Sequence, residues 1–537
     1  MAERGGIDKS TPWSTNSIGM AWWPVYSQNP HDASEVGMTF VAAWRLKATG
    51  SSGCYVSLEL LSATLAVAAI SALLAFHNID FPFGVHPDEA IKVGFAFGQP
   101  DNYRHPPLLI VLARFAAWLD GAVHDRDFRL AGRTVCALAS VAASVLFYLV
   151  LRRYADQFNA FLWGCVFAAS PAITIHAHYF KEDAILIFAI CMGLHALVRL
   201  RERTDIVDLL YFGFALGLAM AAKYVGVINS LVLFVVAIAY CKLEWRQAAI
   251  VAAVGTLTVL AVYAASLLTE TGSGLSTIVR GFVIELNHVE EGHDLKEWFF
   301  EGYGLTHFRY HLIPSLTVPT TVISLGAIAI AILGDRNRAV AAFAGAAIAW
   351  LFMLELSPLK IIGSMRYVLP VAIYLLLAAG IACSMAIAPR SHWMSAGLGL
   401  LAMAASSHAS IEYTGSMSRE NDTRFAAMRF LESRGTTRFL TDYLMGEPAP
   451  ETRDYRDLSS VDYLVSQRFT RYLRGGDLSE QPQLTYVLAG MFRCLDGHIA
   501  AQFSKLYGDY AYVAPTVKIY DLRQARFCIP DPAELGP

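Results

Sequence analysis

The sequence has little charge for its length. Asp, Glu, Lys and Arg make up 16% of its 537 residues, whereas soluble domains carry about 25%. Lys and Arg number 42 against 45 Asp and Glu, so no basic excess is present to neutralise the phosphates of a nucleic acid. Apolar residues make up 55% and form long runs between short charged segments. This distribution excludes a disordered chain, a coiled coil and a nucleic-acid-binding protein, and it indicates a polytopic membrane protein.

Several motifs are also missing. The sequence contains no Gly-rich phosphate loop, no dinucleotide-binding fingerprint and no evident internal repeat. Residues 1–56 lack the order of a cleaved signal peptide, and we predict a disordered cytoplasmic extension there. Six of the eight cysteines lie in or beside apolar runs and show no metal-ligand spacing. Cys494 and Cys528 lie in the tail of the chain, where they either form a disulfide or remain two buried thiols.

The apolar runs predict eleven transmembrane helices, because each is long enough to cross about 30 Å of hydrocarbon at 1.5 Å per residue. The stretch 105–120 is also apolar, but it opens with His-Pro-Pro and carries Arg114, so we expect an interfacial or re-entrant helix there. The predicted spans are 57–77, 131–151, 158–176, 183–200, 207–222, 224–241, 247–268, 313–333, 338–355, 366–388 and 393–412.

The charges of the connecting loops predict the orientation. With a cytoplasmic N-terminus, every short loop assigned to the inside is basic, as the positive-inside rule expects. Only Lys223 separates the spans 207–222 and 224–241, and merging them would move the last two basic loops outside. The basic residues of these inside loops are Arg152, Arg153, Arg199, Arg201, Arg203, Lys242, Arg246, Arg336, Arg338 and Arg390.

Three segments are then external: the loops 78–130 and 269–312 and the tail 413–537. The tail alternates a helical stretch near Arg419–Arg434 with β-rich runs at 438–443, 461–466, 484–488 and 511–521, which is typical of a small α/β domain. We therefore expect an all-α polytopic membrane module over 57–412 with a small external α/β domain. An exported tail favours a bacterial inner membrane with a periplasmic tail.

The first external loop carries two adjacent carboxylates, Asp88 and Glu89, followed by Arg104-His105-Pro-Pro. A carboxylate there can accept a proton from a hydroxyl nucleophile held within hydrogen-bond reach. The alternative is a solvated loop acid, or an N-cap in which Asp88 begins a helix over 89–98.

A second group, His176 to Asp183, stands at the external mouth of the third and fourth spans. Asp183 begins an apolar run, where a carboxylate is costly and usually has a partner; Lys181 is the nearest candidate in the sequence. Lys223 stands alone between two apolar spans. An anionic headgroup would explain this lysine, and the alternative is a snorkelling lysine that marks a turn.

Two further groups lie later in the chain. In the loop 269–312, Glu285 and His288 have a spacing that places them on one helical face, and His293 could complete a divalent metal site; solvated loop side chains are the alternative. Arg366, in Met-Arg-Tyr-Val-Leu-Pro, stands at the external start of the tenth span. A guanidinium at that position is suited to gripping a phosphate with two hydrogen bonds.

The order of these motifs resembles the GT-C glycosyltransferases. The motifs are Asp-Glu after the first span, His-Pro-Pro-Leu, Lys-x-Asp heading a later helix, Ala-Lys-Tyr between helices and Arg-Tyr-x-x-Pro near the end. The chain is most similar to the branch of the protein O-mannosyltransferases and lipid A aminoarabinose transferases, over about residues 57–412. Related aminoarabinose transferases carry Glu-Lys before the Pro-Pro, where this chain has Arg104-His105.

The resemblance implies a sugar transfer from a polyprenyl phosphate to an acceptor hydroxyl on a lipid, polysaccharide or protein, with inversion. It implies that Asp88 activates the acceptor, with Glu89 as its neighbour, and that Asp183 binds or orients the substrates. The cations expected near the donor phosphate are Arg366, Lys223, Lys181, His105 and Arg104. Tyr103, Tyr179 and Tyr367 are the expected substrate contacts.

Two other classes of function stay open at this stage. A secondary transporter of a small or lipid-linked solute would also have many spans, typically with repeated halves and mid-membrane charges. A sensor or assembly protein would use the tail as its binding module. The place of loss-of-function mutations separates the three: external acids for a transferase, mid-span residues for a transporter and the tail for a sensor.

The first prediction concerns the orientation. We expect Arg199–Arg203 in the cytoplasm and Glu285–Asp294 outside, because only the first segment is basic. A cysteine introduced at Arg201 should react with an impermeant thiol reagent only after cells are permeabilised, whereas one introduced at Glu291 should react in intact cells. Equal labelling at the two positions in intact cells would contradict this orientation.

Overall fold

The structure is a computed structural model of the whole chain. It describes residues 58–81, 89–269, 274–291, 305, 307–335, 337–356, 365–418, 420–436, 438–442, 455–467, 469, 482–505 and 516–535. Asp88 and His293 therefore lie outside the described residues, as do residues 1–57.

Helices occupy each of the eleven predicted ranges. They are α1 (Leu58–Phe76), α4 (Asp125–Leu151), α5 (Gln157–Ala168) with α6 (Pro171–Ala177), α7 (Asp183–Glu202), α8 (Ile206–Ala222), α9 (Val225–Cys241), α10 (Trp245–Thr269), α12 (Ile313–Leu316) with α13 (Val318–Ile330) and η2 (Ala331–Asp335), α14 (Arg338–Leu356), α15 (Leu369–Ala382) with η4 (Cys383–Ile387), and α16 (His392–Ser416). In lipid each backbone group must be paired within its own segment, which is why these apolar runs are helical.

The chain is an integral multi-pass membrane protein. Among the described residues, six helices are by themselves long and apolar enough to cross a membrane, or eight if two bent helix pairs each count as one span. Two further apolar helices, α8 and α9, have 17 residues each. Eleven spans therefore remain a prediction, whereas the positions of the helices are confirmed.

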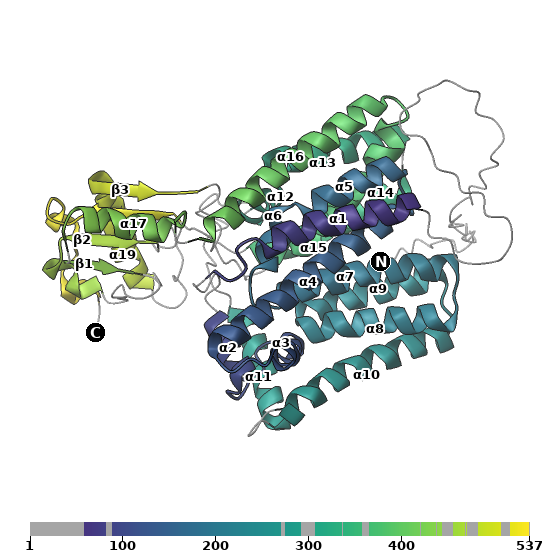
Figure 1. The fold of residues 1–537 in the computed structure, drawn as a ribbon, viewed down its shortest axis with the longest axis horizontal. Helices are drawn as coiled ribbons and strands as arrows, with labels where there is room; N and C mark the ends of the chain where they lie inside the picture. Colours follow the sequence, from purple (N-terminus) through teal and green to yellow (C-terminus); the bar gives the residue numbers. More distant parts are fainter. Residues whose placement is uncertain are drawn as a thin grey trace, which may run out of the picture. The chain divides into compact units, whose positions relative to one another are not determined.

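Small residues let some of these helices approach closely. Gly213 and Gly217 of α8 face α10, and a Cβ atom added at Gly217 would lie 2.5 Å from the carbonyl oxygen of Gly255. Helix pairs in membranes commonly pack through such small residues, because lipid tails supply no hydrophobic drive for association. The two helices lie side by side in Figure 1.

Shorter helices gather at one end of the bundle (Figure 1): α2 (Glu89–Phe97), α3 (Leu108–Asp120) and α11 (Leu275–Glu291). Helix α3 covers most of the stretch predicted as interfacial or re-entrant. Helix α11 packs closely on the loop before α3, since a Cβ atom at Gly281 would lie 2.3 Å from the carbonyl oxygen of Asn102.

Two of the predicted spans are broken. Helices α5 and α6 are bent by 48°, and the segments Phe308–Leu316 and Val318–Gly334 meet at 96°. The second break lies at Thr317, whose φ of 73° is in the left-handed region and whose hydroxyl caps α13 by accepting from the amide of Thr320. Irregular backbone at membrane depth is tolerated where it is buried in protein or lines a polar cavity. The segment Phe308–Leu316 includes the π-helix η1 (Phe308–Leu312).

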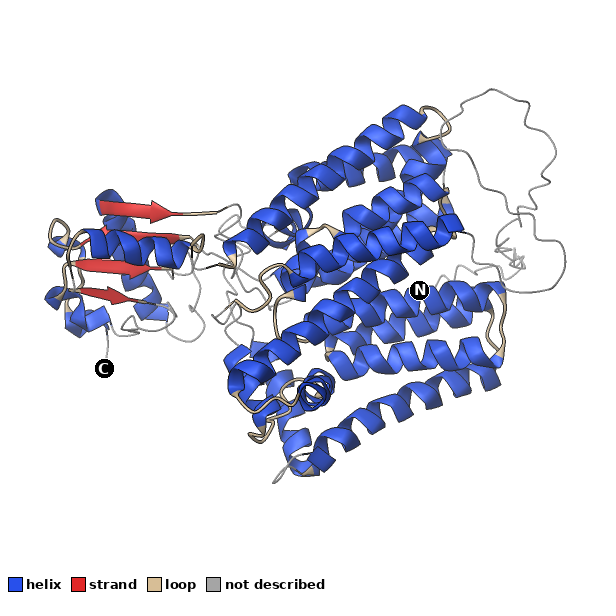
Figure 2. Cartoon of the chain, in the orientation of Figure 1, coloured by secondary structure: helices blue, strands red, loops and turns tan. Residues whose placement is uncertain are grey.

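The C-terminal part is an α/β domain, as predicted, and it contains all strands among the described residues (Figure 2). Its sheet has the order β1-β2-β4-β3, with β1 parallel to β2 and the other pairs antiparallel. One face packs on α17 (Thr423–Ser433) and the other on α19 (Pro482–Leu495). The strands are β1 (Phe439–Thr441), β2 (Tyr463–Ser466), β3 (Ile499–Phe503) and β4 (Val517–Asp521).

Two details of the tail differ from the sequence analysis. The run 484–488 is not a strand but part of α19, because its apolar positions continue in helical spacing through Leu488, Phe492 and Leu495, which all face the core. The strand β3 was not predicted. The helix near Arg419–Arg434 and the strands at 438–443, 461–466 and 511–521 are present over their described parts.

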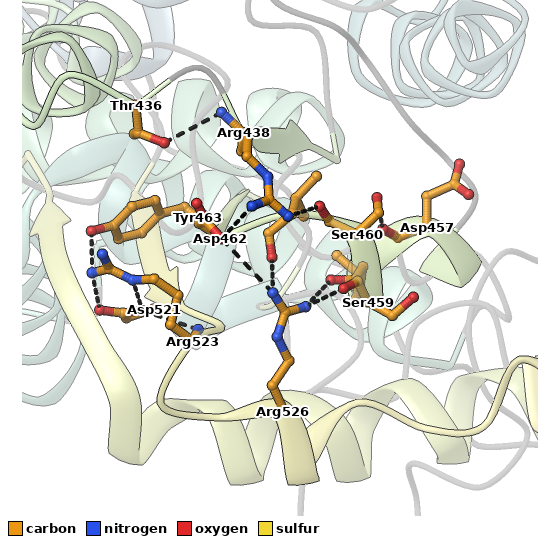
Figure 3. Close-up of polar contacts among 12 residues, drawn as sticks. Thr436, Arg438, Asp457, Ser459, Ser460, Asp462, Tyr463, Asp521, Arg523 and Arg526 are labelled. Carbon is orange, nitrogen blue, oxygen red and sulfur yellow. Dashed lines mark hydrogen bonds and ion pairs between the residues drawn. The ribbon is translucent and has the colours of Figure 1, made fainter.

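A network of arginines fastens the loops at one end of this sheet (Figure 3). Arg526 donates hydrogen bonds to the carbonyl oxygens of Leu458, Ser459 and Val461. Arg523 pairs with Asp521 through two nitrogens, at 2.9 and 2.7 Å. The bonds of Arg526 hold the segment before β2 against the segment after β4.

Cys494 and Cys528 form a disulfide that joins α19 to the end of the domain, with 5.6 Å between the Cα atoms and a sequence separation of 34 residues. This decides between the two alternatives left open by the sequence. A cross-link of this length limits the unfolded ensemble.

We therefore predict that Cys494→Ser or Cys528→Ser destabilises the tail domain by about 2–5 kcal/mol. The single variants and the double variant should be equally sensitive to limited proteolysis in the full-length protein, since each removes the same bond. Cys241→Ser, at a partly buried free thiol of α9, is the control and should match the wild type. Unequal single variants would show that the thiols act separately.

Candidate functional site

Charged side chains from distant parts of the chain meet at the end of the bundle that carries α2. We call them the charged cluster: Glu89, Lys92, Arg133, Lys181, Glu182, Asp183, Lys223 and Arg366. All are buried except Lys223 and Arg366, which are partly buried. They come from α2, α4, the α6–α7 loop, the start of α7, the α8–α9 turn and η3 (Met365–Val368).

Glu89 is anchored by an arginine that the sequence analysis missed. Its two carboxylate oxygens accept from Nε and Nη2 of Arg133, both at 2.7 Å, and Oε1 also accepts from the amide of Phe180 at 3.2 Å. Arg133 in turn donates to the carbonyl oxygens of Ile79 and Phe81. Glu89 thus joins the start of α2 to α4 and to the loop before α7.

Asp183, at the first position of α7, pairs with Lys223. The distance from Lys223 Nζ to Asp183 Oδ1 is 2.5 Å, and His176 Nδ1 lies 4.0 Å from the other carboxylate oxygen. The sequence analysis named Lys181 as the nearest candidate partner; in the structure the α8–α9 turn also brings Lys223 to the carboxylate, although it is 40 residues away in the chain.

Glu182 forms an ion pair with Lys92 of α2, a second residue that the sequence analysis missed. Burial would raise the pKa of Glu182, but Lys92 outweighs it and holds this pKa below its usual range. Burial lowers the pKa of His105 to about 3. His105 is therefore neutral at ordinary pH and can offer a phosphate a hydrogen bond but not a charge.

Lys181 and Arg366 are far apart in the sequence but near enough in the structure to interact electrostatically. Burial and then repulsion from Arg366 hold the pKa of Lys181 well below its usual range. Arg366 lies over the ring of Tyr367, with 5.1 Å from Cζ to the ring centroid, and its Nη2 donates to the Tyr367 hydroxyl at 3.1 Å. Two cations that repel each other in a poorly solvated place favour binding of an anion.

The three predicted tyrosines are placed differently. Tyr367 adjoins Arg366, and Tyr179 is buried edge-on against His176. Tyr103 is buried with its hydroxyl 3.1 Å from Ser266 of α10, and its carbonyl oxygen accepts from the hydroxyl of Tyr224. Tyr103 therefore links the loop before α3 to the start of α9 and to α10. Arg104, the next residue in the chain, is partly buried.

The proposed metal ligands are described only in part. Glu285 lies on α11 and is partly exposed, whereas the side chain of His288 and all of His293 lie outside the described residues. No group of three His, Cys, Asp or Glu side chains suited to a metal occurs within the described part of the chain.

A match to a known family covers part of this arrangement. Residues 104–268 match the family described as dolichyl-phosphate-mannose-protein mannosyltransferase. This segment, which is less than half of the chain, is therefore similar to a glycosyltransferase family. The match includes His105, Arg133, Lys181, Asp183 and Lys223, and it bears out the resemblance seen in the motifs. No curated protein sequence matches the chain.

Solved structures of similar proteins carry related names. The Saccharomyces cerevisiae protein O-mannosyltransferase Pmt1-Pmt2 complex bound to the sugar donor is 22% identical, with a TM-score of 0.33; the match covers 40% of this chain and 34% of that one. ArnT from Cupriavidus metallidurans bound to undecaprenyl phosphate is 18% identical, with a TM-score of 0.44 and coverage of 69% and 72%. The Archaeoglobus fulgidus oligosaccharyltransferase is 14% identical, with a TM-score of 0.46 and coverage of 77% and 69%.

The Glu89–Arg133 pair gives a prediction for the stability of the charged cluster. Glu89→Gln leaves the buried guanidinium of Arg133 without its carboxylate, which should destabilise the protein by about 3–5 kcal/mol. Thermal unfolding in detergent measures this loss. The double variant Glu89→Gln/Arg133→Met removes both charges and should be more stable than Glu89→Gln alone. If the single variant is as stable as the wild type while turnover falls, Glu89 acts in the reaction and not as an anchor.

Proposed function

We propose that the chain transfers a sugar from a polyprenyl phosphate to an acceptor hydroxyl at the end of the bundle that carries the charged cluster, on the external side of the membrane. The observation that carries this proposal is the charged cluster itself, in which Lys223 pairs with Asp183 and Arg366 interacts electrostatically with the buried Lys181. The match of residues 104–268 to the dolichyl-phosphate-mannose-protein mannosyltransferase family supports it.

The donor phosphate would lie against these cations. Arg366 offers a planar fork for two phosphate oxygens, and Lys181 offers a point charge whose pKa an adjacent phosphate would raise again. Lys223 and Arg104 are the further cations, and the neutral His105 is a hydrogen-bond partner. Asp183 holds Lys223 in place at 2.5 Å. As the sugar leaves, the phosphate gains negative charge, which fixed cations in a poorly solvated site stabilise.

The acceptor would be activated by Asp88. Its carboxylate takes the proton of the acceptor hydroxyl as the oxygen attacks the anomeric carbon from the face opposite the phosphate. The bond from that carbon to the phosphate oxygen breaks, and its electron pair leaves with the lipid phosphate. Asp88 directly precedes Glu89, whose bonds to Arg133 and Phe180 tie the start of α2 to the cluster. Inversion follows from this single displacement.

We propose several further features of this protein together with this reaction. They are eleven spans, a bacterial inner membrane, a periplasmic site and tail, and an acceptor that is a lipid, polysaccharide or protein. Tyr103, Tyr179 and Tyr367 would shape the substrate site. A divalent metal at Glu285, His288 and His293 stays a separate prediction.

A secondary transporter remains the second candidate, because two of the spans are broken, at the α5–α6 bend and at Thr317. The charged cluster, however, lies at helix ends and in loops and not at mid-helix. A transporter would lose function on mid-span substitutions and keep it when Asp88 is changed.

The central test is Asp88→Asn, which retains the shape of the side chain and removes its basicity. Turnover with a polyprenyl-phosphate sugar should fall roughly 10²-fold or more, the usual scale for loss of a general base. Donor binding should change little, because the base contributes only in the transition state. Both are measured on purified enzyme whose thermal unfolding matches that of the wild type.

Asp120→Asn is the matched control, since Asp120 is an exposed acid of the same loop region, at the end of α3. It should retain turnover. Near-normal turnover of a folded Asp88→Asn enzyme would show that this residue is only a helix cap or a surface charge, and the proposed reaction would lose its base.

A further inference from the structure

The broken helix before Thr317 carries two histidines that the proposed reaction does not use. His307 and His311 are fully buried, and they are four residues apart, so they share one face of the segment. Their ring centroids are 5.0 Å apart. His311 lies within the π-helix η1, a local geometry that is frequent at functional sites.

Glu355, near the end of α14, holds this segment in place. Its Oε1 accepts from the amide of Phe308 at 3.0 Å, and its Oε2 lies 3.6 Å from Nδ1 of His307, within ion-pair distance. A carboxylate beside one ring nitrogen favours a proton on that nitrogen and so sets the orientation of the imidazole.

Both imidazoles pack against Tyr367. The ring of His307 meets the tyrosine ring at 79° with 6.3 Å between centroids, and the ring of His311 is 6.5 Å away. Tyr367 contacts Arg366 in turn, through its hydroxyl at 3.1 Å and through its ring face. A continuous series of contacts thus runs from Glu355 to His307, Tyr367 and Arg366.

The choice of histidine needs an explanation. Nε2 of His307 is buried and has no hydrogen-bond partner among the described residues, and leaving such a group unpaired destabilises the protein. A phenylalanine would pack in the same place without this cost. A histidine has a role at this position if its pairing with Glu355 fixes the orientation of the imidazole ring, which packs against Tyr367.

We propose that Glu355, His307 and Tyr367 are positioning residues that hold the guanidinium of Arg366 in its phosphate-binding orientation. This inference rests on the proposed function, in which Arg366 binds the donor phosphate. An arginine side chain has many rotamers, and only some of them place the guanidinium against a bound phosphate. A fixed tyrosine that both stacks on the guanidinium and accepts its hydrogen bond lowers the ordering cost at the moment of binding.

The test is a double-mutant cycle on full-length purified enzyme, with a polyprenyl-phosphate sugar as donor. Glu355→Gln, His307→Gln and Tyr367→Phe should each raise the KM for the donor about 3–10-fold, the scale expected when one side chain must be ordered on binding. The kcat at saturating donor should stay within about twofold of wild type, because the reacting groups are untouched. Arg366→Ala should raise the KM further.

The decisive measurement is each substitution in the Arg366→Ala background. If the three residues act through Arg366, adding His307→Gln or Glu355→Gln to Arg366→Ala should change the KM by less than about twofold. A merely structural role would give the full effect in both backgrounds. If His307→Gln fails to fold, Tyr367→Phe carries the same test, since it removes only a hydroxyl.

His195→Gln is the matched control. His195 stands 5.9 Å from the ring of Tyr211 at an angle of 77°, a similar pair about 18 Å along α7 from Asp183, and its loss should leave the donor KM unchanged. Additive effects in the cycle, or unchanged KM in the three variants, would overturn the positioning role alone. An unchanged donor KM in Arg366→Ala would instead overturn the donor site of the proposed function.

Discussion

A charge buried in an apolar helical bundle is costly unless an opposite charge meets it, and this constraint shapes the end of the bundle around α2. Three carboxylates are buried there, and each has a cation of its own: Glu89 has Arg133, Glu182 has Lys92, and Asp183 has Lys223. Removing one partner of such a pair usually costs more than the pair contributes. The pairs therefore restrict how α2, α4, α7 and the α8–α9 turn can move relative to each other.

These pairs also define the electrostatic character of the site. Burial, and after it the neighbouring charge of Arg366, hold the pKa of Lys181 well below its usual range. An anion bound beside both cations would offset their mutual repulsion. Charges that are fixed in advance need no reorganisation when the phosphate charge develops, which is how such sites lower a reaction barrier.

Irregular backbone lies beside these charges. The loop before α7 follows the α5–α6 bend, and the segment with His307 and His311 ends at the 96° bend at Thr317. Such breaks let side chains from the interior of the bundle reach a polar site without exposing unpaired backbone to lipid. The broken helices and the charged cluster thus depend on each other, since the polar surroundings make the breaks tolerable and the breaks bring polar groups inward.

The sequence by itself determined the positions of the helices, because an apolar run in lipid has helix as its one stable state within a single segment. It also determined the α/β character of the tail, apart from 484–488, where five residues are too few to separate a strand from one face of a helix. It pointed to Asp183, Lys181, Lys223 and Arg366 as site residues, because isolated charges near apolar runs need a reason.

The tertiary structure alone decided which charges meet. Lys223 pairs with Asp183, and Arg133 pairs with Glu89, since pairing depends on how helices pack and on the direction of each side chain. Lys92, His307, His311 and Glu355 carried no local signal, because a buried polar residue in an amphipathic stretch looks the same whether it faces a partner or solvent. The disulfide was also decided by the tertiary structure, because the packing of α19 places the Cα atoms of Cys494 and Cys528 5.6 Å apart. Spacing along the chain fixes neighbours within one helix, and contacts between helices are set only when the bundle is assembled.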